Sequence, residues 1–205
     1  HIYSIHCQDV EIELLSGQLS LLNITISPKF KGTIGIQEFP IVVESTISKL
    51  TIEDFSWSDY WNEKGFVVKN IIVYSPKINL LMRASSEEKS NLEQVEYTET
   101  IAELFKSVTI GQVAINNCSI DLAKMSNPTV SIVELDSLSF FLDKIQIDSV
   151  QSKRDPFWFY ENLEFDLKSV KTSIGKRYHL EAENLKISAS NKNLSLENII
   201  ILPFN

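Results

Sequence analysis

The chain has 205 residues, of which 43% are hydrophobic and 22% charged, so it has enough apolar material for a sizeable core and is not disordered as a whole. Its formal net charge is −8, and lysine and arginine are scattered, so neither nucleic acid nor an anionic bilayer surface is an expected partner. No stretch approaches the roughly 18–20 consecutive apolar residues that a membrane-spanning helix needs.

The beginning of the sequence has the character of a trimmed piece. Residues 1–6 contain neither the basic segment nor the apolar segment of a signal peptide, and there is no initiator methionine. We therefore expect a single extended β domain over residues 1–205, a fragment of a longer chain.

Apolar and polar residues alternate along most of the chain, which is the period-2 pattern of half-buried strands. Turn-forming residues separate the alternating runs, as short connections between antiparallel neighbours require. The pattern predicts a mainly β fold, a meander in one extended antiparallel sheet. The expected strands are 10–15, 18–27, 32–39, 41–54, 66–74, 77–82, 107–116, 119–123, 130–142, 145–150, 157–170, 171–190 (interrupted) and 194–202.

Two helices are expected between these strands. Ser90 and Glu93 have the spacing of a capping box, and an amphipathic pattern then predicts a helix over 91–106. A polar linker near 83–90 precedes it. A shorter helix is expected to begin near Ser56 or Ser58 and to stop at Gly65, with its aromatic residues Tyr60 and Trp61 plugging one end of the sheet.

A degenerate repeat indicates how the strands are bounded. Residues 23–28 read Asn-Ile-Thr-Ile-Ser-Pro and residues 198–203 read Asn-Ile-Ile-Ile-Leu-Pro, with a copy longer by one residue at 70–76. We interpret each as a strand that begins after an asparagine turn and ends at a proline, which cannot donate to the ladder. By the same logic, 72–80 and 113–122 are each expected to form a hairpin.

The order of these motifs carries a resemblance. Phe55-Ser56-Trp57, a short helix, Gly65, a strand, Ser75-Pro76 and another strand follow one another, and a polar linker and an amphipathic helix come next. This arrangement resembles the N-terminal periplasmic part of the AsmA/TamB-like family of bacterial cell-envelope proteins. The resemblance covers about 41–123 and looks most like members from Bacteroidetes.

The resemblance implies a long, strongly curved antiparallel sheet that forms a trough or groove with an apolar concave face. It also implies a periplasmic location, attachment to the inner membrane, and a role in phospholipid transport or outer-membrane assembly. The implied partners are a phospholipid or another acyl-chain ligand and an envelope protein. The alternative is a scaffold module that docks a protein partner on its sheet face or edge.

Apolar residues at alternating positions are the candidates for contact with acyl chains. A one-residue slip of register reverses which of them point inward, so the alternation leaves the face of each strand open. The lipid-groove candidates are Ile72, Tyr74, Ile78, Leu80, Val113, Ile115, Ile120, Leu122, Leu138, Phe140 and Leu142.

The sequence contains no catalytic signature, so we expect neither an enzyme nor a cofactor. Glu181 and Glu183 have a spacing compatible with a carboxylate pair, but so does any solvated strand face. Cys7 and Cys118 are too few for a zinc site, so no metal is expected, and whether they form a disulfide stays open. The aromatic run at 157–160 fits either a strand entry or a membrane-touching loop.

Overall fold

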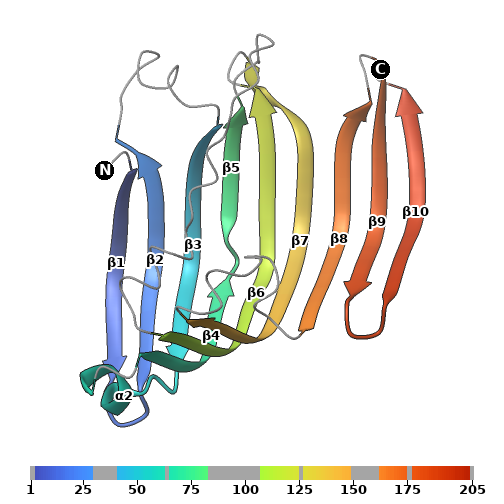
Figure 1. Cartoon of the computed structure of the whole chain (residues 1–205). Helices are drawn as coiled ribbons and strands as arrows, with labels where there is room; N and C mark the ends of the chain where they lie inside the picture. Colours follow the sequence, from blue (N-terminus) through green and yellow to red (C-terminus); the bar gives the residue numbers. More distant parts are fainter. Residues whose placement is uncertain are drawn as a thin grey trace.

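The computed structural model describes residues 3–29, 41–62, 65–82, 107–124, 127–148, 162–174 and 177–203. These ranges form one large sheet and one short helix (Figure 1), which confirms the mainly β fold. The elements are β1 (Tyr3–Glu13), β2 (Gln18–Pro28), β3 (Ile41–Glu53), α2 (Trp57–Trp61), β4 (Phe66–Tyr74), β5 (Lys77–Met82), β6 (Ser107–Lys124), β7 (Asn127–Asp148), β8 (Asn162–Ile174), β9 (Tyr178–Ser188) and β10 (Asn193–Pro203).

The strand order across the sheet is β1-β2-β3-β4-β6-β7-β8-β9-β10, with β5 also pairing with β3 and β6. Most neighbours are antiparallel, as expected, but β4 and β5 run parallel to β6. The sheet is therefore mixed. Strands β4 and β5 lie end to end between β3 and β6, so together they fill one position in the sheet.

The expected hairpins at 72–80 and 113–122 are wrong. Between β4 and β5 the chain does not reverse. It passes through Ser75 and Pro76 and continues in the same direction beside β6. The backbone N–H of Ser75 donates to the carbonyl oxygen of Asn116 at 2.8 Å, and that of Ser119 donates to the carbonyl oxygen of Pro76 at 2.8 Å. These bonds carry the ladder across the break, and β6 itself is one uninterrupted strand of 18 residues.

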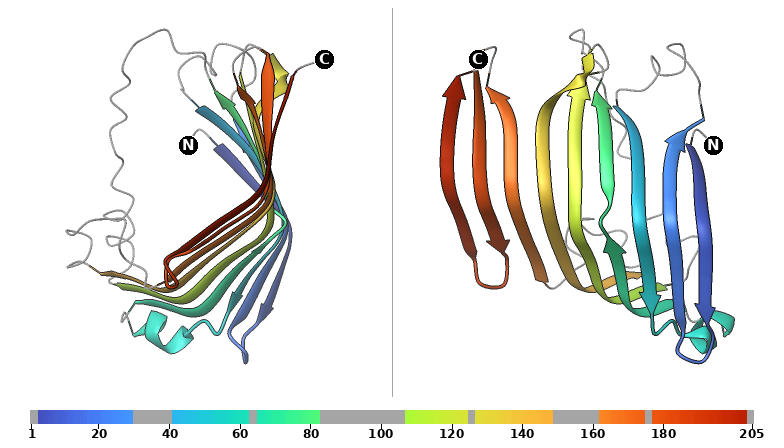
Figure 2. Two further views of the ribbon diagram at one scale, coloured as in Figure 1. Left: turned by 90° about the vertical axis from the view of Figure 1, so that its right-hand side faces the viewer. Right: turned by 180° about the vertical axis from the view of Figure 1, so that it is seen from behind.

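A line of left-handed residues crosses the sheet at mid-strand, and the sheet bends along it. We call it the bend line. Its residues have φ between 46° and 55° and lie at a similar height on β2, between β4 and β5, and on β6, β7, β9 and β10; the described residues of β1, β3 and β8 include none. Figure 2 shows the strands turning sharply near their middles, because a left-handed residue inside a strand redirects the chain. The bend line consists of Asn23, Ser75, Asn117, Ser137, Asn184 and Asn198.

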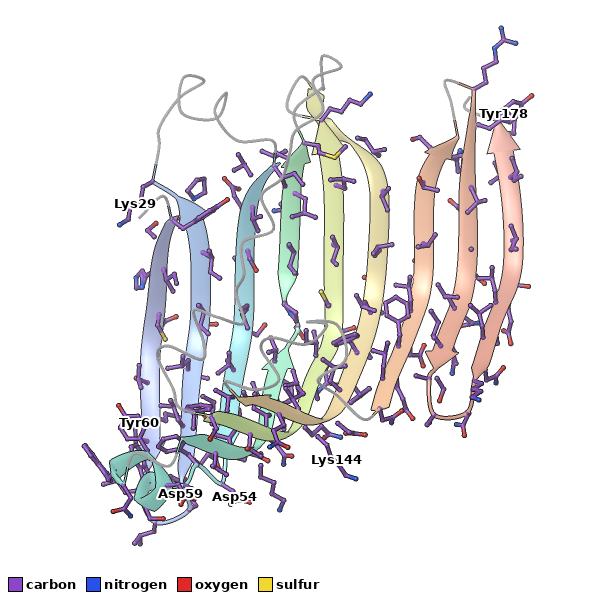
Figure 3. The ribbon with its side chains drawn as sticks, in the orientation of Figure 1. Lys29, Asp54, Asp59, Tyr60, Lys144 and Tyr178 are labelled. Atoms are coloured by element: carbon purple, nitrogen blue, oxygen red, sulfur yellow. The ribbon has the colours of Figure 1, made fainter. Side chains whose placement is uncertain are left out.

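The bend line corrects the interpretation of the asparagine repeat. Asn23 lies inside β2 and Asn198 inside β10, so neither begins a strand. Asn117 likewise lies inside β6, and the expected break at 143–144 lies inside the single strand β7. A second bend occurs lower in the sheet, where Asp54 and Lys144 have φ of 53° and 54° (Figure 3).

The short helix α2 forms as expected, with Ser56 as its N-cap: the backbone N–H of Asp59 donates to Ser56 Oγ at 3.3 Å. It ends at Trp61 with Asn62 as C-cap, so Gly65 is not the residue that stops it. The expected plug is also different. Trp61 is 73% exposed, and Phe55 instead forms the centre of an aromatic cluster, with ring centroids 4.6 Å from Trp57 and 5.3 Å from Phe66.

Several expectations fall outside the described residues: the helix over 91–106, the linker near 83–90, the strand at 32–39 and the aromatic run at 157–160. Within the described ranges, no helix has the length and apolar character that crossing a membrane requires.

Candidate functional site

One face of the sheet carries an unbroken apolar surface from edge to edge. Residues that lie directly opposite each other on neighbouring strands point to the same face, so the register defines transverse rows of side chains. One row below the bend line crosses all nine positions of the sheet without a polar residue. It consists of Val10, Leu21, Leu50, Val73, Ile115, Phe140, Phe165, Ile187 and Leu194.

Further rows on the same face are mainly apolar, with Ser45 and Thr172 as their polar members. The next row down is Ile12, Leu19, Ile52, Ile71, Val113, Leu142 and Leu163. The first two rows above the bend line are Ile5, Ile26, Ser45, Ile78, Ile120, Leu135, Val170 and Ala182, then Val43, Leu80, Leu122, Val133, Thr172, Leu180 and Ile201. No charged side chain stands in these four rows, which we call the apolar face.

The opposite face is polar. Its rows include Glu44, Asn79, Asp121, Glu134, Lys171 and Glu181 above the bend line, and Glu53, Asn70, Gln112, Asp143 and Asn162 below it. Hydrogen bonds join neighbours in the lower row. Asn70 Nδ2 donates to Glu53 Oε2 at 2.8 Å, and Gln112 Nε2 donates to Asp143 Oδ1 at 2.9 Å. We call this the polar face, although it is not polar throughout. A buried strip within it is 1–4% exposed and consists of Ser20, Thr51, Ala114, Val42 and Ala123.

The apolar face lies on the inside of the bend. Cys118, Leu138 and Leu167 sit at the bend line and are only 2–8% exposed, although the sheet is a single layer. Side chains from both halves pack over them, among them Ile115 from below and Ile120 from above. Because side chains from both halves pack over the same three residues, this side is the inside of the bend that Figure 2 shows. On the other side of the bend line, residues such as Asn117 and Lys168 are exposed.

Nine of the eleven lipid-groove candidates lie in these four rows or at their bend: Ile78, Leu80, Val113, Ile115, Ile120, Leu122, Leu138, Phe140 and Leu142. Ile72 and Tyr74 point to the polar face. Their partners on β6 are Ala114 and Asn116. These two residues alternate with Val113 and Ile115, which are on the apolar face. Whether the nine bind a ligand remains a prediction.

The bend line explains why Tyr74 and Ile78 are on different faces. In a regular strand, residues an even number apart share a face. Across the bend line, residues three apart share one: Ile115 and Cys118 belong to the same apolar cluster, as do Leu135 and Leu138. The four-residue spacing from Tyr74 to Ile78 spans Ser75, which has φ of 46°, so the usual alternation is reversed there.

Sequence reasoning misses much of the apolar face. The candidates do not include the contributions of β2, β3, β8 and β9, although Leu167 is only 2% exposed and Leu185 packs against it. The sequence pattern that could have identified these residues is an alternation of apolar residues in which the inward-facing positions shift by one at an asparagine or serine. An example is the shift at Asn184, between Ala182 and Leu185.

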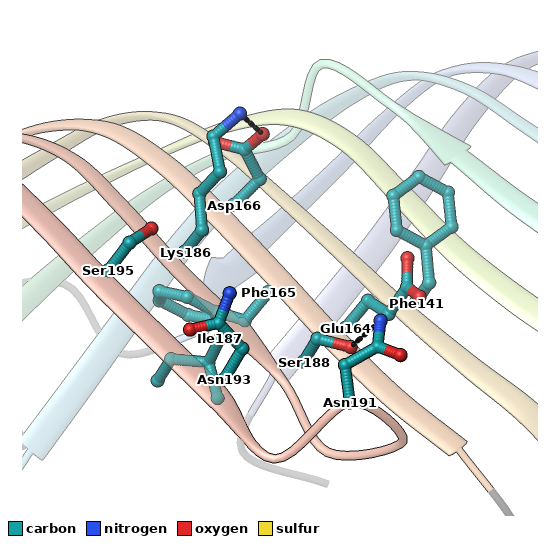
Figure 4. Close-up of a pocket in the computed structure, with 10 residues that line it drawn as sticks. All are labelled: Phe141, Glu164, Phe165, Asp166, Lys186, Ile187, Ser188, Asn191, Asn193 and Ser195. Atoms are coloured by element: carbon teal, nitrogen blue, oxygen red, sulfur yellow. Dashed lines mark hydrogen bonds and ion pairs between the residues drawn. The ribbon is translucent and has the colours of Figure 1, made fainter.

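The polar face contains an open pocket near its β8–β10 corner (Figure 4). Lys186 Nζ lies 3.2 Å from Asp166 Oδ2, and Asn191 Nδ2 donates to Ser188 Oγ at 3.2 Å. The opposite charges neutralise each other in solvent. Glu181 and Glu183 are similarly engaged: Lys171 Nζ is 3.3 Å from Glu181 Oε1, and Glu183 Oε2 accepts from Asn198 Nδ2. These contacts are those of a hydrated strand surface.

The two cysteines are free thiols on separate strands, β1 and β6, which resolves the open question of a disulfide. Cys118 is 2% exposed within the apolar cluster at the bend line, and this burial raises the pKa of its thiol. Burial therefore keeps the thiol in its neutral form, because a charged thiolate would be desolvated in this apolar cluster.

Neither a scan against models of protein families nor a search of curated proteins finds a match to this chain.

Proposed function

We propose that this chain is a non-enzymatic segment of a periplasmic envelope protein that binds the acyl chains of phospholipids along its apolar face. The observation that carries the proposal is the nine-residue apolar row that crosses every position of a sheet bent toward that side. Large apolar surfaces on soluble proteins are usually sites of contact with another molecule.

The physical driving force is burial of apolar area. Removing apolar surface from water contributes roughly 25 cal/mol per Å², so an acyl chain that covers a few hundred Å² gains several kcal/mol before ordering costs. The rows contain no ion or catalytic group, so recognition is by contact and shape. A lipid headgroup would remain outside the face, in water.

The resemblance of the motif order to AsmA/TamB-like proteins supports the wider setting. It supports tethering of the longer protein to the inner membrane and a role in phospholipid transport or outer-membrane assembly. The resemblance rests on the order of motifs in the sequence, from Phe55-Ser56-Trp57 through Gly65 to Ser75-Pro76.

A second candidate function is a scaffold that docks a protein partner by strand addition. The observation that favours it is the apolar character of both sheet edges. Eleven exposed large apolar side chains lie on or next to β1 and β10, including Ile5 at 73% and Ile201 at 59% exposure. Mass spectrometry of protein purified without detergent separates the two functions, since co-purifying phospholipid supports acyl-chain binding.

The direct test is the substitution Ile78→Glu. Ile78 stands in an upper apolar row and packs against the cluster at the bend line. A carboxylate there should abolish binding of a fluorescent fatty acid, because the ligand would desolvate the charge. Folding should survive better than in a closed core, since water reaches an open surface.

Tyr74→Glu is the matched control, because Tyr74 lies on the polar face and is 38% exposed. It should bind fatty acid as the parent does. A folded Ile78→Glu variant with parental binding would contradict the proposal. Global unfolding of Ile78→Glu, monitored by thermal denaturation, would indicate a packed closed core at this position.

A further inference from the structure

We propose that one end of the sheet docks on a zwitterionic lipid bilayer by inserting a tip, which consists of the turn between β1 and β2 together with α2. The apolar side chains of the tip are Leu14, Leu15, Tyr60 and Trp61. This inference rests on the proposed function, because it identifies where acyl chains pass between a bilayer and the apolar face.

The side chains of the tip stand in water although they are large and apolar. Leu15 is 106% exposed and Trp61 is 73% exposed, and Leu14 and Tyr60 are 68% and 44% exposed. Figure 1 shows the turn and α2 at the same end of the strands, opposite to the end where N and C are marked. Exposed apolar side chains that gather in one place mark a site of contact with another molecule or with a membrane.

The turn and the helix are held together by close contacts. The backbone N–H of Phe55 donates to the carbonyl oxygen of Gly17 at 2.9 Å. Gly17 has φ of 64°, and a Cβ there would lie 2.7 Å from the carbonyl oxygen of Phe55, so this approach requires glycine. The ring of Tyr60 contacts both Phe55 and Trp61, with centroid distances of 5.8 and 5.4 Å. The exposed side chains therefore have a packed support.

The composition of the tip fits a membrane better than a protein partner. Tryptophan and tyrosine combine an apolar ring with a polar N–H or O–H, so they favour the boundary between lipid headgroups and acyl chains. Leucine favours the hydrocarbon beyond that boundary. The tip also projects, since it is built from a turn and a helix of five residues. A fluid bilayer adapts to projecting side chains, whereas a protein would need a matching cavity.

The charges beside the tip indicate the kind of lipid. Glu13 ends β1, and Asp59 lies in the first turn of α2. Lys69 Nζ lies 3.3 Å from Asp54 Oδ2, so this cation is already paired. An anionic membrane surface would repel the acidic side chains, whereas a zwitterionic surface carries no net charge. The expected lipid is therefore a zwitterionic phospholipid such as phosphatidylcholine.

The tip continues into the apolar face. Ile12 and Leu19 flank the turn and pair with each other in the lowest of the four apolar rows, and Leu19 stands opposite Ile52. Glu13 and Gln18, the pair nearer the turn, alternate with them and point to the opposite face. An inserted tip thus brings the apolar face next to the acyl chains of the bilayer, with no charged row in between.

The test is flotation of the full chain with phosphatidylcholine vesicles. Leu15→Glu and Trp61→Glu are the tip variants, and Tyr178→Glu is the matched control, since Tyr178 is 48% exposed at the opposite end of the sheet (Figure 3). The parent and Tyr178→Glu should float with the vesicles. Each tip variant should have a partition coefficient lower by about tenfold or more, because a charge replaces an apolar side chain that the hydrocarbon buries. All three variants should keep the parental circular dichroism.

Binding of a monomeric fluorescent fatty acid separates this inference from the proposed function. Both tip variants should bind it as the parent does, and a loss there would overturn the inference by making the tip part of the acyl-chain site. A parent that stays with the soluble fraction, as when the tip docks a protein, would also overturn it. So would tip variants that float like the parent, a Tyr178→Glu variant that does not float, or stronger flotation with phosphatidylglycerol vesicles. A parent that floats without binding fatty acid would contradict the proposed function alone.

Discussion

At the scale of single residues, the bend depends on side chains that tolerate a left-handed backbone. Four of the six bend-line residues are asparagine and two are serine. Asparagine enters the left-handed region more readily than other non-glycine residues, because its short polar side chain can bond locally. On the outer side of the bend these side chains face water or a polar neighbour: Asn23 Nδ2 donates to Gln8 Oε1 at 2.8 Å.

The backbone requirement is testable at Asn117, which has φ of 55° and is exposed. Valine there should lower the free energy of unfolding by about 1–2 kcal/mol, because a β-branched residue resists the left-handed region. Glycine, which enters that region freely, should remain within about 1 kcal/mol of the parent. Urea denaturation measures both, and equal stability of the two variants would show that the bend does not need the left-handed conformation.

The buried thiol predicts a pH dependence. Burial raises the pKa of Cys118 in the folded state above its unfolded value, so the folded state retains the proton more tightly. The free energy of unfolding is therefore unaffected below the unfolded-state pKa and falls as pH rises through the folded-state pKa. Between about pH 8 and 10 the parent should lose more stability than Cys118→Ala, measured by denaturant titration.

At the scale of strands, the sequence predicts where a strand begins and ends better than it predicts how the chain connects one strand to the next. β4 and β5 have the expected bounds, and β2 and β3 agree to within one residue, because their alternation is regular and ends at turn residues. At Asn117 the same turn signal marks a bend inside β6. Asparagine favours both a reversing turn and a left-handed strand residue, so its presence alone cannot distinguish them.

The connection from α2 to β4 depends on Gly65, although not as a helix cap. Its φ is 138°, a region that side chains rarely adopt, and a Cβ at this position would collide with Ser107. Gly65→Val should therefore cost about 1–3 kcal/mol in denaturant unfolding. Thr109→Val is the control, since Thr109 is exposed on β6 and a β-branched residue fits a strand. A Gly65→Val variant as stable as this control would contradict the assignment.

At the scale of the whole molecule, the apolar face exists because of the register in which the strands pair. The alternation of apolar and polar residues within each strand determines that register only in part. The alternation of Val113 with Ile115 is visible in the sequence, but the phase change at each bend-line residue is not. Alternation alone therefore groups Val113 and Ile115 with Tyr74, which the register puts on the opposite face. The parallel pairing of β4 and β5 with β6 is equally non-local and has no signature in the strands themselves.

The extent of the apolar face predicts how affinity depends on ligand length. Nine strand positions at roughly 4.8 Å spacing give a surface on the order of 40 Å across. A fatty acid lying across the strands therefore meets new apolar side chains as it lengthens. Each additional CH₂ should improve binding by up to about 0.8 kcal/mol, roughly fourfold in Kd, with less where one side of the chain stays in water.

Calorimetric titration with decanoate, tetradecanoate and stearate checks this length dependence below their micelle-forming concentrations. Affinity should rise through the whole series in the parent and in Tyr74→Glu, and the rise should be lost in Ile78→Glu. A small closed cavity would instead favour the ligand that fills it and reject longer ones. An affinity that peaks at tetradecanoate and falls at stearate would therefore contradict an open surface that spans the sheet.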